Sequence, residues 1–247
     1  MIRIAAVGDV HLGEDAHGRL RPALERVGEH ADVLLLAGDL TRHGTVEEAT
    51  VVADEFGDLA VPVIAVLGNH DYHGDAVGEV TKVLEGRGIR VLEGDGVVLP
   101  VGGRKLGVAG VKGFGGGFAG KCGSAFGEPE MKAFIRHTVG VADTLRTALE
   151  SLDCDIRVAL THYAPTSQTL HGEPPEIYPF LGAYQLGEAI DGTGTDLALH
   201  GHAHFGCERG LTPAGVRVRN VAQPVIRAAY ACYSLEPQER ELVVQSA

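Results

Sequence analysis

Short apolar runs recur along the chain, and each leads within a few residues into glycine or threonine followed by polar side chains. Residues 63–67, Val-Ile-Ala-Val-Leu, illustrate the pattern, because Gly68 and the polar residues Asn69, His70 and Asp71 follow directly. Runs of this length, rich in β-branched residues, are typical of buried strands. We predict such strands over residues 2–8, 33–37, 63–67, 156–160 and 197–199.

Helical patterns lie between these runs. Thr45 and Glu48 have the spacing of a capping box and predict a helix over residues 45–56. Pro129 is well placed in the first turn of a long helix over residues 128–152. Further helices are predicted near residues 19–29, 75–85 and 183–190. This alternation is typical of an α/β fold, in which helices pack against the strands.

The middle and the end of the chain have a different pattern. Residues 90–111 contain shorter strand-like runs, and the glycine-rich loop 113–127 follows as either a mobile lid or a plain surface loop. A proline-containing loop occupies residues 164–180. Closing antiparallel strands are predicted over residues 216–221, 227–235 and 239–244. Because no repeat or linker interrupts the pattern, we expect one domain covering residues 1–247.

Composition restricts the class of protein. The 247 residues are 45% apolar and 22% charged, as in an ordinary soluble globular protein. The net charge of −12 disfavours duplex nucleic acid or an anionic membrane as the main partner, since both select lysine and arginine. A phosphorylated small substrate stays compatible with this charge, because bound cations can invert the local field.

The chain lacks the features of an exported or membrane-spanning protein. No apolar run approaches the length of about 20 residues that a membrane span needs. The N-terminus runs directly into a strand pattern and has no secretory signal. The four cysteines form no C-x-x-C pair and predict reduced thiols. We therefore expect a cytoplasmic protein, whose oligomeric state the sequence does not indicate.

The ends of the predicted strands carry the side chains that bind metal ions in proteins. Carboxyl ends of strands joined by helical crossovers share one edge of a sheet, so polar groups placed there converge. One Gly-Asp after a strand is usually a turn or a helix cap, but five such endings form a pattern. The candidate ligands are Asp9, His11, Asp39, Asn69, His162, His202 and His204.

Seven candidate ligands exceed what one tetrahedral or octahedral ion binds beside its waters. Two ions with one shared carboxylate account for all of them, and Asp39 is assigned as the bridge. One ion then takes Asp9, His11 and His204, and the other takes Asn69, His162 and His202. Two ions roughly 3.5–4 Å apart can hold a bridging hydroxide that attacks phosphorus. Mixed nitrogen and oxygen ligands suit divalent or trivalent Mn, Fe, Zn or Co.

The ordered motifs Gly-Asp-x-His, Gly-Asp, Gly-Asn-His-Asp, Thr-His and Gly-His-x-His span residues 8–204. This set resembles the calcineurin-like metallophosphoesterase superfamily. The resemblance implies a four-layer α-β-β-α sandwich, in which two mixed β-sheets pack face to face between outer helices. It also implies the same ligand assignment and hydrolysis of a small-molecule phosphomonoester or phosphodiester, with nucleotides and cyclic nucleotides among the candidates.

By the same resemblance, His70 lies outside the metal shell, contacts the phosphate and protonates the leaving oxygen. A general acid is needed because an alkoxide leaves poorly at neutral pH. Protein Ser/Thr phosphatases of this superfamily carry an aspartate and an arginine shortly after the second motif, where this chain has Arg42 and His43. The chain therefore resembles the small bacterial phosphoesterases. The group that orients His70 stays open, since the side chain of the adjacent Asp71 is expected to diverge.

Two other functions compete with this interpretation. A non-catalytic scaffold or binding protein with the same fold would be expected to lose several ligands, whereas every expected position is filled. A metallohydrolase that cuts C–N or C–O bonds would be expected to show H-x-H-x-D-H, but Phe205 and Gly206 follow His202-Ala203-His204. The sequence does not identify the substrate.

Overall fold

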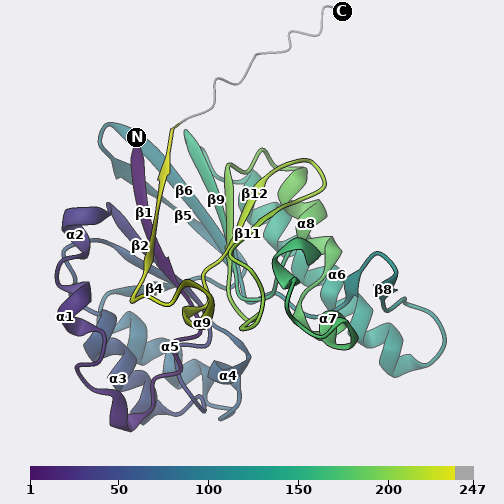
Figure 1. Cartoon of the computed structure of the whole chain (residues 1–247), viewed down its shortest axis with the longest axis horizontal. Helices are drawn as coiled ribbons and strands as arrows, with labels where there is room; N and C mark the ends of the chain where they lie inside the picture. Colours follow the sequence, from purple (N-terminus) through teal and green to yellow (C-terminus); the bar gives the residue numbers. More distant parts are fainter. Residues whose placement is uncertain (237–247) are drawn as a thin grey trace, which may run out of the picture.

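The computed structural model describes residues 1–236 and contains two large mixed sheets (Figure 1). The first sheet has the order β13-β1-β2-β3-β4. Its strands β1 to β4 run parallel, and β13 pairs antiparallel with β1. The strands are β1 (Ile2–Val7), β2 (Val33–Ala37), β3 (Val63–Val66), β4 (Ile89–Val91) and β13 (Ala231–Leu235).

The second sheet has the order β11-β12-β10-β9-β6-β5. The four inner strands run parallel, and the edge strands β11 and β5 pair antiparallel with their neighbours. The strands are β5 (Asp95–Val101), β6 (Arg104–Val111), β9 (Ile156–Thr161), β10 (Leu197–His200), β11 (Arg209–Leu211) and β12 (Arg217–Asn220).

Alternation of side chains along each strand builds the layers. In β1, Ile2 and Ile4 point into the core between the two sheets, whereas Ala5 and Val7 point toward the outer helices. Val108 and Leu160 of the second sheet fill the same central core from the other side. The two sheets therefore pack face to face, and each has one face left for helices.

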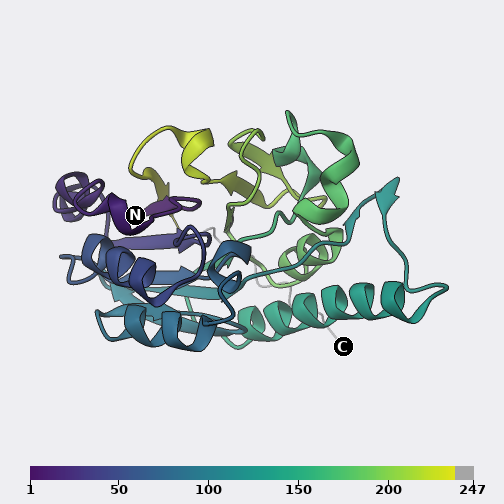
Figure 2. The same ribbon diagram turned by 90° about the horizontal axis from the view of Figure 1, so that it is seen from below.

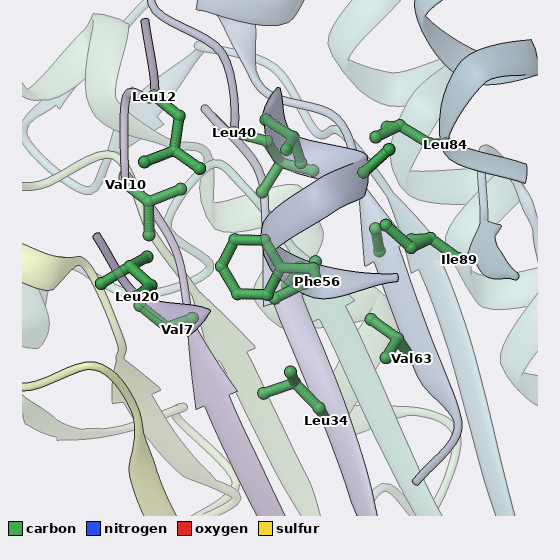
Figure 3. Close-up of a cluster of buried hydrophobic side chains, with 14 of the residues drawn as sticks. Val7, Val10, Leu12, Leu20, Leu34, Leu40, Phe56, Val63, Leu84 and Ile89 are labelled. Carbon is green, nitrogen blue, oxygen red and sulfur yellow. The ribbon is translucent and has the colours of Figure 1, made fainter. Parts of the chain in front are cut away.

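Helices cover the outer face of the first sheet, where Phe56 is buried among residues of β1, β2 and β3 (Figure 3). These helices are α1 (Arg21–Leu24), α2 (Val27–His30), α3 (Val46–Phe56) and α5 (Val77–Glu85). The outer face of the second sheet packs against α6 (Pro129–Glu150) and α8 (Tyr184–Asp191). The predicted four-layer α-β-β-α sandwich is thus confirmed.

Shorter elements occupy the loops. The 113–127 segment reaches out beside the N-terminal end of the long helix α6 (Figure 2). The α-helices and strands in loops are α4 (Asn69–Tyr72), β7 (Gly117–Phe118), β8 (Lys121–Cys122), α7 (Tyr178–Leu181) and α9 (Gln223–Ile226). The 3-10 helices are η1 (Glu14–Ala16), η2 (Ser167–Leu170) and η3 (Pro175–Ile177). No described helix has the length and apolar character required to cross a membrane.

Three predicted elements differ from the structure. The helix expected over 19–29 is two short helices, and the first begins only at Arg21, because the Glu55 carboxylate accepts the N–H groups of Leu20 and Arg21. Strand β12 pairs antiparallel with β11, as predicted, but parallel with β10 on its other side, because the chain returns through β11 between them. The strand expected over 227–235 begins at Ala231, and the strand expected over 239–244 lies outside the described residues.

Candidate metal centre

The carboxyl ends of β1, β2 and β3 face those of β9 and β10, and the candidate ligands meet there. Hydrogen bonds join the two sheets at this edge, including one from the N–H of Gly8 to the Val221 carbonyl at 2.9 Å. His162 Nδ1 contacts the Ala37 carbonyl oxygen at 2.8 Å, which connects the end of β9 to the end of β2. The two sheets thus hold their polar strand ends in fixed relative positions.

One group of side chains comprises Asp9, His11, Asp39 and His204, whose ligand atoms all lie within 4.8 Å of one another. His204 Nε2 lies 2.8 Å from Asp9 Oδ1. His11 Nε2 lies 3.7 Å from Asp39 Oδ2, too far for a hydrogen bond. All four are ligands predicted from the sequence. Asp9, His11 and His204 are the residues assigned there to one ion, and Asp39 is the assigned bridge.

A second group comprises Asp39, His162 and His202, whose ligand atoms also lie within 4.8 Å of one another. His162 Nε2 lies 3.0 Å from Asn69 Oδ1 and 3.3 Å from Asp39 Oδ1, so the amide belongs to this group. His202 Nε2 contacts the Phe180 carbonyl oxygen at 3.1 Å, which leaves Nδ1 available to a metal ion. The structure therefore brings together all seven predicted side chains in two groups that share Asp39.

The backbone at this edge is strained. Asp9, His11, Asp39 and His202 have φ values of 56°, 42°, 50° and 69°, in the left-handed region that residues with a side chain rarely adopt. Such conformations cluster at functional sites, where the surrounding structure holds them. A Cβ atom at Gly68 would lie 2.1 Å from Asp39 Oδ1, so glycine is required there for the Asp39 carboxylate to approach.

The donor set fits metal ions. His11 Nε2 is buried and has no hydrogen-bond partner within the described part of the chain. An unpaired buried nitrogen is costly, and a metal ion would satisfy it. His162 has the arrangement usual for a ligand, because Nδ1 contacts a backbone carbonyl and Nε2 points at the carboxylate group.

Electrostatics set different protonation states for the histidines. Burial alone would raise the pKa of the Asp39 carboxyl, but the charge and hydrogen bond of His162 hold it well below its usual range. Burial would lower the pKa of His162, but the Asp39 charge raises it to about 9. Burial lowers the pKa of His202 to about 3, and the nearby His162 adds to this effect. Without metal, His162 is therefore protonated at pH 7 and His202 is neutral.

Metal binding at pH 7 is expected to release the proton of His162, because an imidazole binds metal only in its neutral form. Above about pH 9 most of this proton has already dissociated, so the number of protons released should fall by about one between about pH 8 and pH 10. Calorimetric titration with Zn²⁺ in buffers of different ionisation enthalpy measures this number. A release that does not change with pH would contradict this assignment.

His70 lies beside the first group and is oriented by a backbone carbonyl. His70 Nδ1 lies 2.8 Å from the Arg42 carbonyl oxygen. The backbone N–H of His70 donates to Asp39 Oδ1 at 2.8 Å. The ring packs edge-on against that of His11, with centroids 4.5 Å apart. This carbonyl contact answers the question that the sequence left open, and Nε2 is the nitrogen left to contact a substrate.

Asp71 instead holds the loop that carries Asp39. Its carboxylate is fully buried and accepts the N–H groups of Leu40, Thr41 and Gly68 and the Thr41 hydroxyl. The two side chains of His70 and Asp71 therefore diverge, as expected. Asp71 thus connects the loop after β2, which carries Asp39, to the loop after β3.

Replacing Asp71 by asparagine is expected to lower the free energy of unfolding by about 2–3 kcal/mol, because an amide NH₂ group would face buried N–H donors. Asp75→Asn is the matched control, since Asp75 is exposed and four residues away. Denaturant unfolding of the three metal-free proteins measures the difference. Equal midpoints for Asp71→Asn and the wild type would contradict this role.

The glycine-rich loop 113–127 packs against α7. The N–H groups of Gly116 and Gly117 donate to the Pro179 and Gly182 carbonyls at 2.7 and 2.8 Å. The Thr138 hydroxyl of α6 also donates to the Gly115 carbonyl. The structure thus shows the loop attached to α7 and α6.

Sequence reasoning missed Lys112 and the two tyrosines around it. Lys112 follows β6 at the same edge, and Tyr72 and Tyr163 each lie one or two residues beyond a candidate site residue. A signal was present, because Lys112 directly follows the strand-like runs predicted within residues 90–111 and precedes the glycine-rich loop.

The chain belongs to the calcineurin-like phosphoesterase family, whose model matches residues 2–206. A search of curated proteins finds no match. Among solved structures, phosphopantetheinyl hydrolase from Mycobacterium tuberculosis is similar, with 16% identity, a TM-score of 0.67 and coverage of 96% of this chain and 97% of that one. GAP50, the anchor in the inner membrane complex of Plasmodium, has 11% identity, a TM-score of 0.52 and coverage of 90% and 72%. These two likenesses show the shared fold.

Proposed function

We propose that the protein is a dinuclear metal-dependent phosphoesterase that hydrolyses phosphomonoesters or phosphodiesters. One observation supports the proposal more than any other: seven candidate ligand side chains from five strand ends form two groups around one shared carboxylate, Asp39. Family membership supports the same reaction class. The proposal includes the cytoplasmic location expected from the sequence. All four cysteines lie in the described part of the chain and form no disulfide there, which is consistent with that location.

The residues divide the work of the reaction. Asp9, His11, Asp39 and His204 would hold one ion, and Asp39, Asn69, His162 and His202 the other. Bound ions would activate a water and neutralise phosphoryl oxygens. His70, fixed through Nδ1 by the Arg42 carbonyl, would present Nε2 to the leaving oxygen and donate its proton. The surrounding structure holds four of the ligands in strained backbone conformations, which would orient their side chains before substrate binds.

The rival proposal is a scaffold or anchor that keeps the fold without activity, and GAP50 is described as an anchor. The unpaired, buried His11 Nε2 favours an intact metal centre, since a scaffold gains nothing from an unsatisfied buried nitrogen. The left-handed backbone at Asp9, His11, Asp39 and His202 points the same way.

Hydrolysis of p-nitrophenyl phosphate and bis-p-nitrophenyl phosphate by the metal-loaded protein tests the proposal. We expect turnover with at least one of Mn²⁺, Fe²⁺, Co²⁺ and Zn²⁺, and loss of turnover after treatment with a chelator. A panel of nucleotides, cyclic nucleotides and sugar phosphates then identifies the substrate class. No turnover of any ester with any of these metals would favour the scaffold.

A further inference from the structure

Lys112 lies at the same sheet edge as the candidate ligands. It follows β6, and its carbonyl oxygen accepts the N–H groups of His162 and Tyr163 at 2.9 and 3.1 Å. The backbone of Lys112 is therefore joined directly to the end of β9, where His162 lies. The lysine belongs to the surroundings of the second group of ligands.

Three aromatic rings surround the ammonium group of Lys112. Nζ lies 5.0 Å from the centroid of the Tyr72 ring, 5.2 Å from that of Phe114 and 5.3 Å from that of Tyr163. Tyr72 ends α4, the helix that begins with Asn69, and the Tyr163 ring lies 4.4 Å from the His202 ring. The ammonium group thus lies between two elements that supply the second group of ligands.

Among the residues that the structure describes, this cation has no ion-pair partner. Within the described residues, Nζ forms no ion pair, and its one hydrogen bond goes to the Gly113 carbonyl at 3.3 Å. The neighbouring Glu93 carboxylate accepts the Lys112 backbone N–H and the Tyr72 hydroxyl instead, both at 3.4 Å. Burial lowers the pKa of Lys112, and the charges of Glu93 and Asp39 oppose that shift. A half-buried ammonium without an ion pair is costly, so an incoming anion would be bound well.

We propose that Lys112 binds a second negative charge on the substrate, beyond the phosphoryl oxygens that the two metal ions would neutralise. This inference rests on the proposed phosphoesterase function. His70 lies beside the first group of ligands, whereas Lys112 lies beside the second, so the two residues contact different parts of the substrate. The second charge comes either from the third oxygen of a phosphomonoester or from a separate phosphate on the substrate. Lys112 thus selects for substrate charge.

Lys112→Met tests the proposal, because methionine keeps the contacts with the aromatic rings and removes the charge. If Lys112 binds the third phosphoryl oxygen, we expect kcat/KM for p-nitrophenyl phosphate to fall about 10- to 100-fold, the range for a charge-assisted hydrogen bond. Turnover of bis-p-nitrophenyl phosphate, which has one negative charge, should change by less than about threefold. Lys105→Met is the control, since Lys105 is exposed near the opposite end of β6 and pairs with Asp153.

A second pair of substrates separates the two sources of charge. The p-nitrophenyl ester of thymidine 5′-phosphate has one negative charge, and its 3′-phosphorylated form carries a separate phosphate. If Lys112 binds a separate phosphate, Lys112→Met slows only the 3′-phosphorylated form. If it binds the third phosphoryl oxygen, the two diesters are slowed equally little and p-nitrophenyl phosphate is slowed most. Metal content, measured for every variant, must equal that of the wild type.

Equal losses on all four substrates, or no loss on any, would overturn the proposal for Lys112 and leave the phosphoesterase proposal intact. If the wild-type protein hydrolyses nothing, the phosphoesterase proposal fails and binding measurements decide the role of Lys112. If Lys112 binds the third phosphoryl oxygen, metal-loaded wild-type protein should then bind inorganic phosphate about 10- to 100-fold more tightly than Lys112→Met does, with dimethyl phosphate unaffected. If it binds a separate phosphate, the same difference should appear only for the 3′-phosphorylated diester. Equal affinities of the two proteins for both inorganic phosphate and the 3′-phosphorylated diester would overturn it.

Discussion

Replacing Asp39 by alanine is expected to remove metal from both groups of ligands and to lower kcat on the order of 10³-fold. Asp39 is the one residue shared by the two groups, and its carboxylate also accepts the backbone N–H of His70. Its pKa lies well below the usual range, so the carboxylate stays charged at every pH at which the enzyme would work. Losing this charge is therefore expected to weaken the binding of both ions.

Elemental analysis and hydrolysis of p-nitrophenyl phosphate, measured on the same preparation, test this expectation. Asp39→Asn is a second variant that keeps the side-chain size and tolerates the left-handed backbone, so it separates the loss of charge from backbone strain. Asp58→Asn is the control, because Asp58 has nearly the same φ, 51°, and is exposed. If Asp39→Ala keeps wild-type metal content, the shared-ligand assignment is wrong.

Replacing His70 by alanine is expected to leave the metal content unchanged and to lower kcat about 10²- to 10⁴-fold, the usual contribution of general acid–base catalysis. His70 contacts the centre through its backbone N–H, while its ring is held by the Arg42 carbonyl. The side chain can therefore be removed without removing a candidate ligand. This separates its role from that of Asp39.

The identity of the leaving group makes this test specific. A p-nitrophenolate leaves as a stable anion and needs little protonation, whereas an alkoxide needs a proton. We expect His70→Ala to slow an alkyl phosphate at least about tenfold more than p-nitrophenyl phosphate. His17→Ala serves as the control, since His17 is exposed on a surface loop. Equal slowing of both esters would show that His70 binds the phosphate without donating a proton.

Part of the convergence of the candidate ligands could be predicted from the sequence, because each ligand directly follows a strand run. A buried strand must end, and a polar side chain directly after it lies at the sheet edge, so Asp39 and Asn69 could be placed near each other from the strand runs alone. His162 follows a strand of the second sheet, so its position beside Asp39 depends on how the two sheets pack. The four-layer sandwich followed from the resemblance, and the structure explains it by the alternation of Ile4 and Ala5 between two cores. Parallel pairing of neighbouring strands then brings the ends together.

The remaining features depend on backbone geometry that residue identities do not encode. The contact that orients His70 comes from the carbonyl of Arg42, and any residue at that position could supply it. The direction of β12 depends on the crossover through β11, and an apolar run reads the same in both directions. Lys112 is surrounded by rings from three separate segments, and only the tertiary structure brings these rings together.

The number of metal ions in the active protein tests the central claim most directly. Metal-free protein is titrated with Mn²⁺ while hydrolysis of p-nitrophenyl phosphate and bound metal are followed together. The shared position of Asp39 between two groups of ligands predicts that activity reaches its maximum at two ions per chain. Full activity at one ion per chain, or activity that needs no metal, would contradict the account.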